Sequence, residues 1–132
     1  MTDTPERALR EAEGWLVSAR RGLPDAAEDE ARANVCCAQS IHAIIRANDA
    51  LSLGFLGHKP TRHDDAAVVF AKIIKQGRLP KEAEEFKELV ADAMRDKSGA
   101  DYGKKSFSYE DAEGYIGRAE HFIQMAKDLL KL

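Results

Sequence analysis

Apolar residues recur every three or four positions along most of the chain, which is the spacing of one face of an α-helix. The first such segment begins at Thr4 and Pro5, a capping residue and a first-turn proline, and it ends at Gly22 and Pro24. No stretch alternates apolar and polar residues over the length of a strand. The pattern therefore predicts helices only.

A second helix is predicted from Asp25 to about Phe55, because this span contains no proline, and Gly57 and Pro60 end it. Its apolar stripe consists of Cys37, Ile41, Ile44, Ile45, Leu51 and Phe55. Asn48 falls within that stripe, where a buried amide needs partners. We expect Asn48 to hydrogen-bond to a neighbouring helix.

Three further helices complete the prediction. The third begins near residues 61–64, with Thr61 or His63 as its cap, and ends before Gly77. The fourth opens around Pro80 and is expected to end at Lys97, Ser98 and Gly99, and the fifth opens with Ser108 and Asp111 as a capping box. The sequence thus predicts an all-α protein, an antiparallel up-and-down bundle of four to five helices that forms one domain over residues 1–132.

Composition narrows the class of protein. Hydrophobic residues make up 44% of the 132 residues and charged residues 33%, and no apolar run is long enough to cross a membrane. The N-terminal stretch has no secretory signal pattern, so we expect a soluble cytoplasmic protein without a membrane partner. Cys36 and Cys37 are neighbours on one helix, which strains a disulfide between them and predicts buried thiols.

The net charge of −3 argues against a generally basic nucleic-acid binder, but one region is locally basic. Between Gly57 and Arg78 only Asp64 and Asp65 oppose five cations. These are Lys59, Arg62, Lys72, Lys75 and Arg78, and they form either a solvated helical face or a set of phosphate contacts.

The loop "HKPTRHDD" supplies His58 and His63 as nitrogen ligands beside Asp64 and Asp65, but it matches no specific zinc spacing. Capping of the next helix is the preferred interpretation, and we expect neither a metal site nor a cofactor. Glycine-rich phosphate loops of the forms GxxxxGK[ST] and GxGxxG are also absent, which argues against an autonomous nucleotidyltransferase or NTPase.

A second face of the long helix carries polar residues at helical spacing. Gln39, His42, Arg46 and Asp49 fall within about a quarter of the helical wheel, interrupted by Val35 and Leu53. This stripe is either the outer face of a helix at the edge of the bundle, or it lines a ligand-binding cleft or a dimer interface.

Several stretches together resemble the HEPN family of helical domains, in particular its small stand-alone prokaryotic and archaeal members. They are "ARANVCCAQSIHAIIRANDALSLGFLG", "GHKPTRHDDAAVVF" and "MRDKSGADYG" followed by "SYEDAEGYIGRAEHFI". The resemblance covers most of the chain. It implies a helical bundle that dimerises and either cleaves RNA without a metal or binds a nucleotide, RNA or a minimal nucleotidyltransferase partner.

The family's ribonuclease motif is an arginine, then four to six intervening residues, then a histidine. Here Arg95 is followed at those positions by Ala100, Asp101 and Tyr102, and none is a histidine. Asp101 and Tyr102 ordinarily titrate far from neutrality and are poor general acids or bases.

Two interpretations of this segment follow. We expect a degenerate motif in which Arg95 pairs with Asp101 or with helix-end carbonyls, and Tyr102 packs back on the bundle, so that the protein is a binding module. The alternatives are an endoribonuclease toxin of a toxin–antitoxin pair that uses Arg95 with Asp101 or Tyr102, and a non-catalytic helical scaffold.

Overall fold

The computed structural model describes residues 3–60, 62 and 65–132, and it confirms the predicted all-α bundle. Within that part of the chain there are five α-helices, two 3-10 segments and no strand. The order is α1 Pro5–Gly22, η1 Leu23–Glu28, α2 Glu30–Leu56, α3 Ala66–Lys75, η3 Lys81–Phe86, α4 Lys87–Tyr102 and α5 Tyr109–Leu130.

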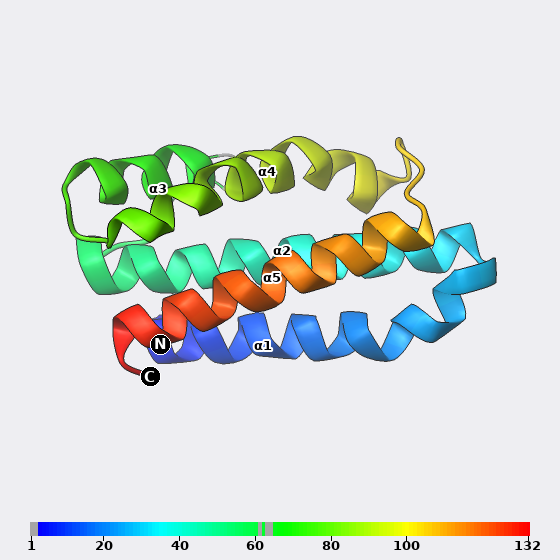
Figure 1. Cartoon of the computed structure of the whole chain (residues 1–132), viewed down its shortest axis with the longest axis horizontal. Helices are drawn as coiled ribbons and strands as arrows, with labels where there is room; N and C mark the ends of the chain where they lie inside the picture. The colour runs from blue at the N-terminus through cyan, green and yellow to red at the C-terminus, as the bar shows by residue number, and fades with distance from the viewer. Residues whose placement is uncertain (1–2, 61, 63–64) are drawn as a thin grey trace.

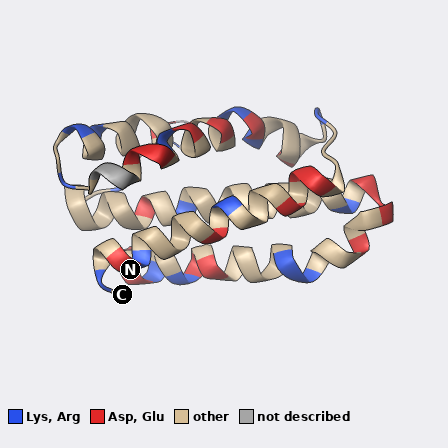
Figure 2. Cartoon of the chain, in the orientation of Figure 1, with Lys and Arg blue, Asp and Glu red and all other residues tan. Residues whose placement is uncertain are grey.

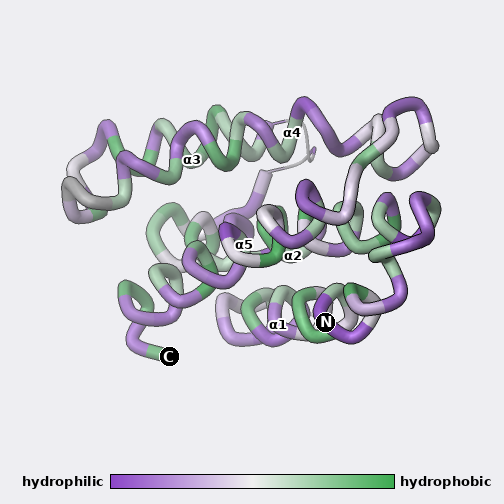
Figure 3. The backbone as a smooth tube through the Cα atoms, turned by 45° about the vertical axis from the view of Figure 1, so that its right-hand side comes forward, coloured by the Kyte–Doolittle hydropathy of each residue, from purple (hydrophilic) through white to green (hydrophobic). Residues whose placement is uncertain are grey.

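The bundle is built around α2, which packs against α1, α4 and α5 (Figure 1). Successive long helices run in opposite directions, so the start of α1 and the end of α5 lie at the same end of the molecule (Figure 1). Hydrophobic and hydrophilic positions are interspersed along each helix (Figure 3), and most of the hydrophobic ones are buried in one core. The largest fully buried side chains are Phe70, Phe122, Ile41, Ile44, Ile45, Leu51 and Ile73. Burial of these faces supplies the main driving force for the fold.

Most of the predicted helix ends are confirmed. The Thr4 hydroxyl accepts a hydrogen bond from the backbone N–H of Arg7, and Ser108 and Asp111 form a reciprocal capping box. Gly57 ends α2 with φ of 82°, a left-handed conformation in which glycine is not strained. Local capping chemistry therefore sets these boundaries.

Two predicted boundaries are wrong, and a third is not fully described. The second helix does not begin at Asp25: the chain continues from α1 into η1, and Asp29 then caps α2 by accepting from the N–H groups of Ala31 and Arg32. Helix α3 begins at Ala66, and the caps proposed for it, Thr61 and His63, lie outside the described residues.

The second wrong boundary is the end of the fourth helix, which continues past Ser98 and Gly99 to Tyr102. Gly99 lies within the helix and leaves room for Lys105: a Cβ at this position would lie 2.8 Å from Cβ of Lys105. The chain reverses instead at Gly103, where φ is 66°, and the N–H of Lys104 donates to the Gly99 carbonyl. The turn therefore lies four residues later than predicted.

The buried polar residue within the apolar stripe behaves as predicted. Asn48 is fully buried, and its side-chain amide donates to the carbonyl of Ala66 at 3.2 Å, which ties α2 to the first turn of α3. Cys36 and Cys37 are buried free thiols, also as predicted. No helix in the described ranges combines the length and apolarity that a membrane crossing requires.

Charged residues are unevenly placed along the bundle (Figure 2). Acidic residues gather where η1, the start of α2 and the start of α5 meet, around a cavity of about 600 Å³. The acidic residues that line it are Glu28, Asp29, Glu30 and Glu110. This end of the molecule also contains the turn that follows α4 (Figure 1).

Candidate functional site

The polar stripe of α2 lies between α1 and α4. His42 contacts a ring on α1 and a carboxylate on α4, and Arg46, one turn further on, pairs with Glu11 of α1. Because neighbouring helices reach both sides of the stripe, it is not simply an outer face exposed to solvent. It is a partly buried polar seam, for which we use the name α2 seam: Gln39, His42, Arg46 and Asp49, together with Val35.

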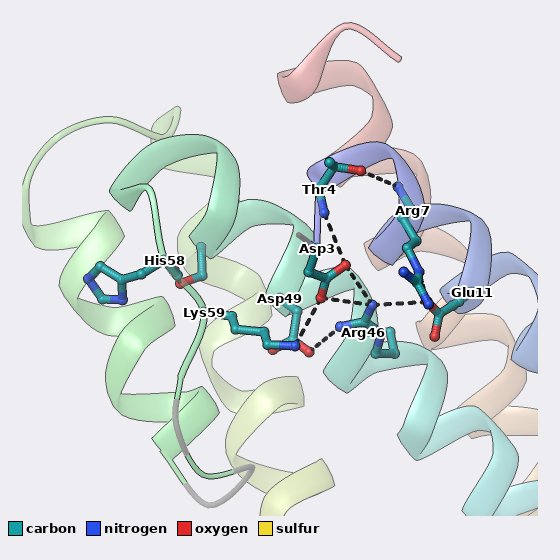
Figure 4. Close-up of polar contacts among 9 residues, drawn as sticks. Asp3, Thr4, Arg7, Glu11, Arg46, Asp49, His58 and Lys59 are labelled. Atoms are coloured by element: carbon teal, nitrogen blue, oxygen red, sulfur yellow. Dashed lines mark hydrogen bonds and ion pairs between the residues drawn. The ribbon is translucent and has the colours of Figure 1, made fainter. Parts of the chain in front are cut away.

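Arg46 is the centre of a charge cluster at one end of the α2 seam (Figure 4). Its Nη1 donates to Oδ2 of Asp49 at 2.7 Å, and its Nη2 lies 3.2 Å from Oδ2 of Asp3 and 3.2 Å from Oε2 of Glu11. Lys59, from the segment after α2, reaches the same Asp3 oxygen at 3.0 Å. The Arg46 guanidinium thus binds carboxylates from α2, from α1 and from the residues before α1.

The cluster keeps its charges although it is sheltered from solvent. Burial opposes the charged form of Arg46, but the hydrogen bond to Asp49 and the neighbouring charges of Asp3 and Glu11 outweigh it and raise the pKa of the guanidinium. Burial likewise opposes ionisation of Asp3, yet hydrogen bonds from Lys59 and Arg46 lower the pKa of its carboxyl group. The ion pairs of this cluster hold α1 against α2.

The middle of the α2 seam holds a histidine between two helices. His42 stacks on Trp15 of α1 with ring centroids 4.9 Å apart, and its Nε2 lies 3.2 Å from Oδ1 of Asp101 on α4. Since a carboxylate only accepts, Nε2 carries the hydrogen, and Lys97 binds the other oxygen of Asp101 at 3.1 Å. Nδ1 of His42 has no partner among the described residues and is not sealed from solvent.

The remaining end of the α2 seam is open. Gln39 is half-buried, while Val35 is 55% exposed and Trp15, on the adjacent α1, is 39% exposed. This end of the α2 seam therefore combines solvent-accessible apolar and hydrogen-bonding groups. This composition is typical of the surfaces through which proteins associate.

The residues proposed around the degenerate motif do not come together. Arg95 pairs with Asp92 at 3.1 Å and with Asp96 at 3.5 Å, on the side of α4 that faces α5. Asp101 instead faces α2, and Tyr102 is 72% exposed. The expected pairing of Arg95 with Asp101 and the expected packing of Tyr102 on the bundle are therefore both wrong, because α4 continues as a helix and separates these side chains.

A second polar cluster, between α4 and α5, was not found from the sequence. The Tyr115 hydroxyl donates to Oδ2 of the buried Asp96, and Lys105 donates to Oδ1 at 2.9 Å. Burial opposes ionisation of Asp96, but the hydrogen bonds from Tyr115 and Lys105 lower the pKa of its carboxyl group. The cluster borders a cavity of about 360 Å³ whose rim includes Arg95 and Arg118. In the sequence, Asp96 looks like any surface residue of a charged helix.

The basic region between Gly57 and Arg78 is only partly available for a ligand. Lys59 binds Asp3, and Nη1 of Arg78 donates to the carbonyl of Phe55 at 2.8 Å, so both have structural contacts. Lys72 and Lys75 are exposed on α3. Arg62 is exposed as well. Among the described residues, no group of three or more histidine, cysteine, aspartate or glutamate side chains could hold a metal ion.

Comparison with known proteins does not assign the chain to a family. No protein-family model matches the chain, and no curated protein matches it at a significant level. Any assignment of function therefore depends on the contacts described above.

Proposed function

We propose that the chain is a HEPN-like binding module that acts as a homodimer rather than an enzyme, with the open end of the α2 seam as its dimer surface. The resemblance of the sequence to HEPN domains implies that such a module engages a nucleotide, RNA or a nucleotidyltransferase partner. The all-α antiparallel bundle supports this proposal at the level of the fold.

The observation that carries the proposal is the exposure of Val35 and Trp15 beside half-buried polar groups. Trp15, 39% exposed, stacks on His42, and Val35, 55% exposed, lies two helical turns before His42 on the same face of α2. In a self-complementary dimer each copy would bury these groups against its partner, and the polar groups would fix the register.

The arrangement of the degenerate motif supports binding rather than catalysis. A metal-independent cleavage of RNA requires a cation and an acid–base group around one phosphate. Arg95 lies on the α5 side of α4 with its charge neutralised by Asp92 and Asp96, whereas Asp101 lies on the α2 side. These side chains do not converge on a common substrate position.

Sedimentation of the wild-type protein and of one charge-introducing variant tests the dimer. Val35→Glu places a carboxylate on the proposed surface and should raise the dissociation constant of the dimer at least about tenfold, since an unpaired charge in an interface costs more than 1.4 kcal/mol. Val68→Glu is the matched control, because Val68 is 68% exposed on α3. A wild-type protein that sediments as a monomer at micromolar concentration would refute the proposal.

One observation favours a second function, that of an endoribonuclease. His42 lies against Asp101, in the segment where the family motif would place its histidine, and the side chain of His42 is 26% exposed. An imidazole held by a carboxylate is a suitable acid–base group near neutral pH. Metal-independent cleavage of single-stranded RNA that disappears in His42→Gln, in a protein that remains folded, would establish this function instead.

A further inference from the structure

Tyr102 presents an aromatic ring to solvent at a rigid turn. It is the last residue of α4 and is 72% exposed. Behind it, Gly103 adopts the left-handed conformation, and both its N–H and that of Lys104 bond to the Gly99 carbonyl. The position of the ring is therefore set by the helix end and not by packing against the core.

The segment after the ring is held in place from two sides. The carbonyl of Lys105 accepts from the Asn34 side chain at 3.3 Å, and the ammonium group of Lys105 binds Asp96. The contact of Lys105 with Gly99 closes the turn against α4. A turn fixed in this way presents its side chains without a large entropic cost on binding.

A cation without a carboxylate partner lies beside the ring. The ammonium group of Lys104 is 6.0 Å from the centroid of the Tyr102 ring, and among the described residues no carboxylate pairs with it. By contrast, Arg95, Lys97 and Lys105 are each paired with aspartate. The stretch from Arg95 to Lys105 contains four basic and two acidic residues, so its charge is positive in a chain of net charge −3.

We propose that Tyr102 and Lys104 form a contact for one nucleotide unit, whose base stacks on Tyr102 and whose phosphate pairs with Lys104. A flat aromatic face beside an unpaired ammonium group matches a ligand that combines a base with a phosphate, and stacking on aromatic side chains is how proteins hold single-stranded nucleic acids. This inference rests on the proposed binding module and names its ligand, an unpaired nucleotide of a single strand or a free mononucleotide.

Fluorescence anisotropy with a labelled oligoadenylate single strand, and competition by AMP, test the contact and separate its two sources. Tyr102→Ala should weaken binding by about fivefold or more, because stacking of one base contributes at least about that factor, whereas Tyr102→Phe keeps the ring and should bind within about twofold of the wild type. Lys104→Gln should reduce the slope of log affinity against log salt by about 0.7. If AMP competes as well as an unlabelled strand, the ligand is a mononucleotide; if the strand competes much better, it is a single-stranded nucleic acid.

Val68→Ala is the matched control for the loss of an exposed apolar side chain and should leave affinity unchanged. If Tyr102→Ala unfolds normally and binds the strand as tightly as the wild type, the proposed contact at Tyr102 is overturned. Nucleotides would then bind elsewhere on the module. A wild-type protein that binds neither the strand nor AMP would also overturn it. The dimer is measured independently by sedimentation, so the failure of this inference and the failure of the proposed function are distinguishable.

Discussion

His42 of α2 and Asp101 of α4 are hydrogen-bonded at 3.2 Å although 59 positions separate them in the sequence. The same imidazole stacks on Trp15 of α1. The His42 side chain thus links α2 to α4 through a hydrogen bond and to α1 through an aromatic contact. At this position the polar stripe of α2 contributes to helix packing.

Replacement of this histidine should weaken the bundle measurably. His42→Ala removes the hydrogen bond to Asp101 and the stacking on Trp15, and we expect a loss of about 1–2 kcal/mol in the free energy of unfolding. Urea denaturation followed by circular dichroism measures the change. His121→Ala is the control, because His121 is exposed on α5, and it should change stability by less than about 0.5 kcal/mol. Equal effects of the two substitutions would contradict the structural importance of His42.

The hydrogen bond between Tyr115 and Asp96 predicts a specific dependence of stability on pH. The folded protein lowers the pKa of Asp96, so this carboxylate stabilises the fold above its unfolded pKa and the contribution is lost as pH falls through the lower folded value. Burial and the hydrogen bond to Asp96 raise the pKa of Tyr115, so its contribution is complete below the unfolded pKa near 10 and is lost as pH rises above it.

Tyr115→Phe should therefore lower stability at neutral pH by about 1–3 kcal/mol and also flatten the decline above about pH 10. Thermal unfolding across a pH series measures both effects. Tyr109→Phe is a suitable control, because the Tyr109 hydroxyl makes an exposed hydrogen bond to Glu113 at 3.5 Å. A variant that keeps the full alkaline decline would show that another group is responsible.

The charge cluster in Figure 4 should be sensitive to the loss of the Arg46 guanidinium, which binds Asp3, Glu11 and Asp49. The Arg46 side chain is 15% exposed and that of Asp49 is 6% exposed, so Arg46→Ala removes a cation that binds a buried carboxylate at 2.7 Å. We expect a loss of about 3 kcal/mol or more. Arg95→Ala removes an arginine whose side chain is 66% exposed and should cost much less stability than Arg46→Ala. A stable Arg46→Ala protein would contradict a locking function for the cluster.

The basic face of α3 can be separated from the Tyr102 contact by its salt dependence. If Lys72 and Lys75 each bind a phosphate, the double change to glutamine should reduce the log–log salt slope for single-stranded RNA by about 1.4, at about 0.7 per contact. Affinity measured between low and moderate salt gives this slope. An unchanged slope would show that neither lysine binds a phosphate and that both are ordinary solvated surface residues.

The sequence was sufficient for the parts of the fold that depend on neighbours in the chain. Helical periodicity predicted the bundle, and local chemistry predicted the caps at Thr4 and Ser108 and the turn at Gly57. The position of Asn48 within an apolar stripe likewise predicted its hydrogen bond to the next helix. Each of these features involves groups whose spacing along the chain fixes what they can contact.

Features that depend on contacts between distant segments were not predictable in this way. Ser98 and Gly99 carry the usual signals of a helix end, but Lys105 packs over Gly99 and the helix continues. The partner of Asp101 is a histidine from α2, and the partner of Asp96 is a tyrosine from α5. The sequence analysis grouped Asp101 with Arg95, whereas the helix directs these two side chains to different sides of α4.

The packing around Gly54 shows how close the two ends of the helical chain lie. A Cβ on Gly54 would lie 2.4 Å from Cδ2 of Leu130 and 3.9 Å from Cγ of Pro5, so the first residue of α1 and the last residue of α5 meet over the same turn of α2. A short peptide could therefore join the ends. New termini opened at Gly77, an exposed turn residue with no neighbour within 4 Å of its Cβ position, would then give a circular permutant with the same core.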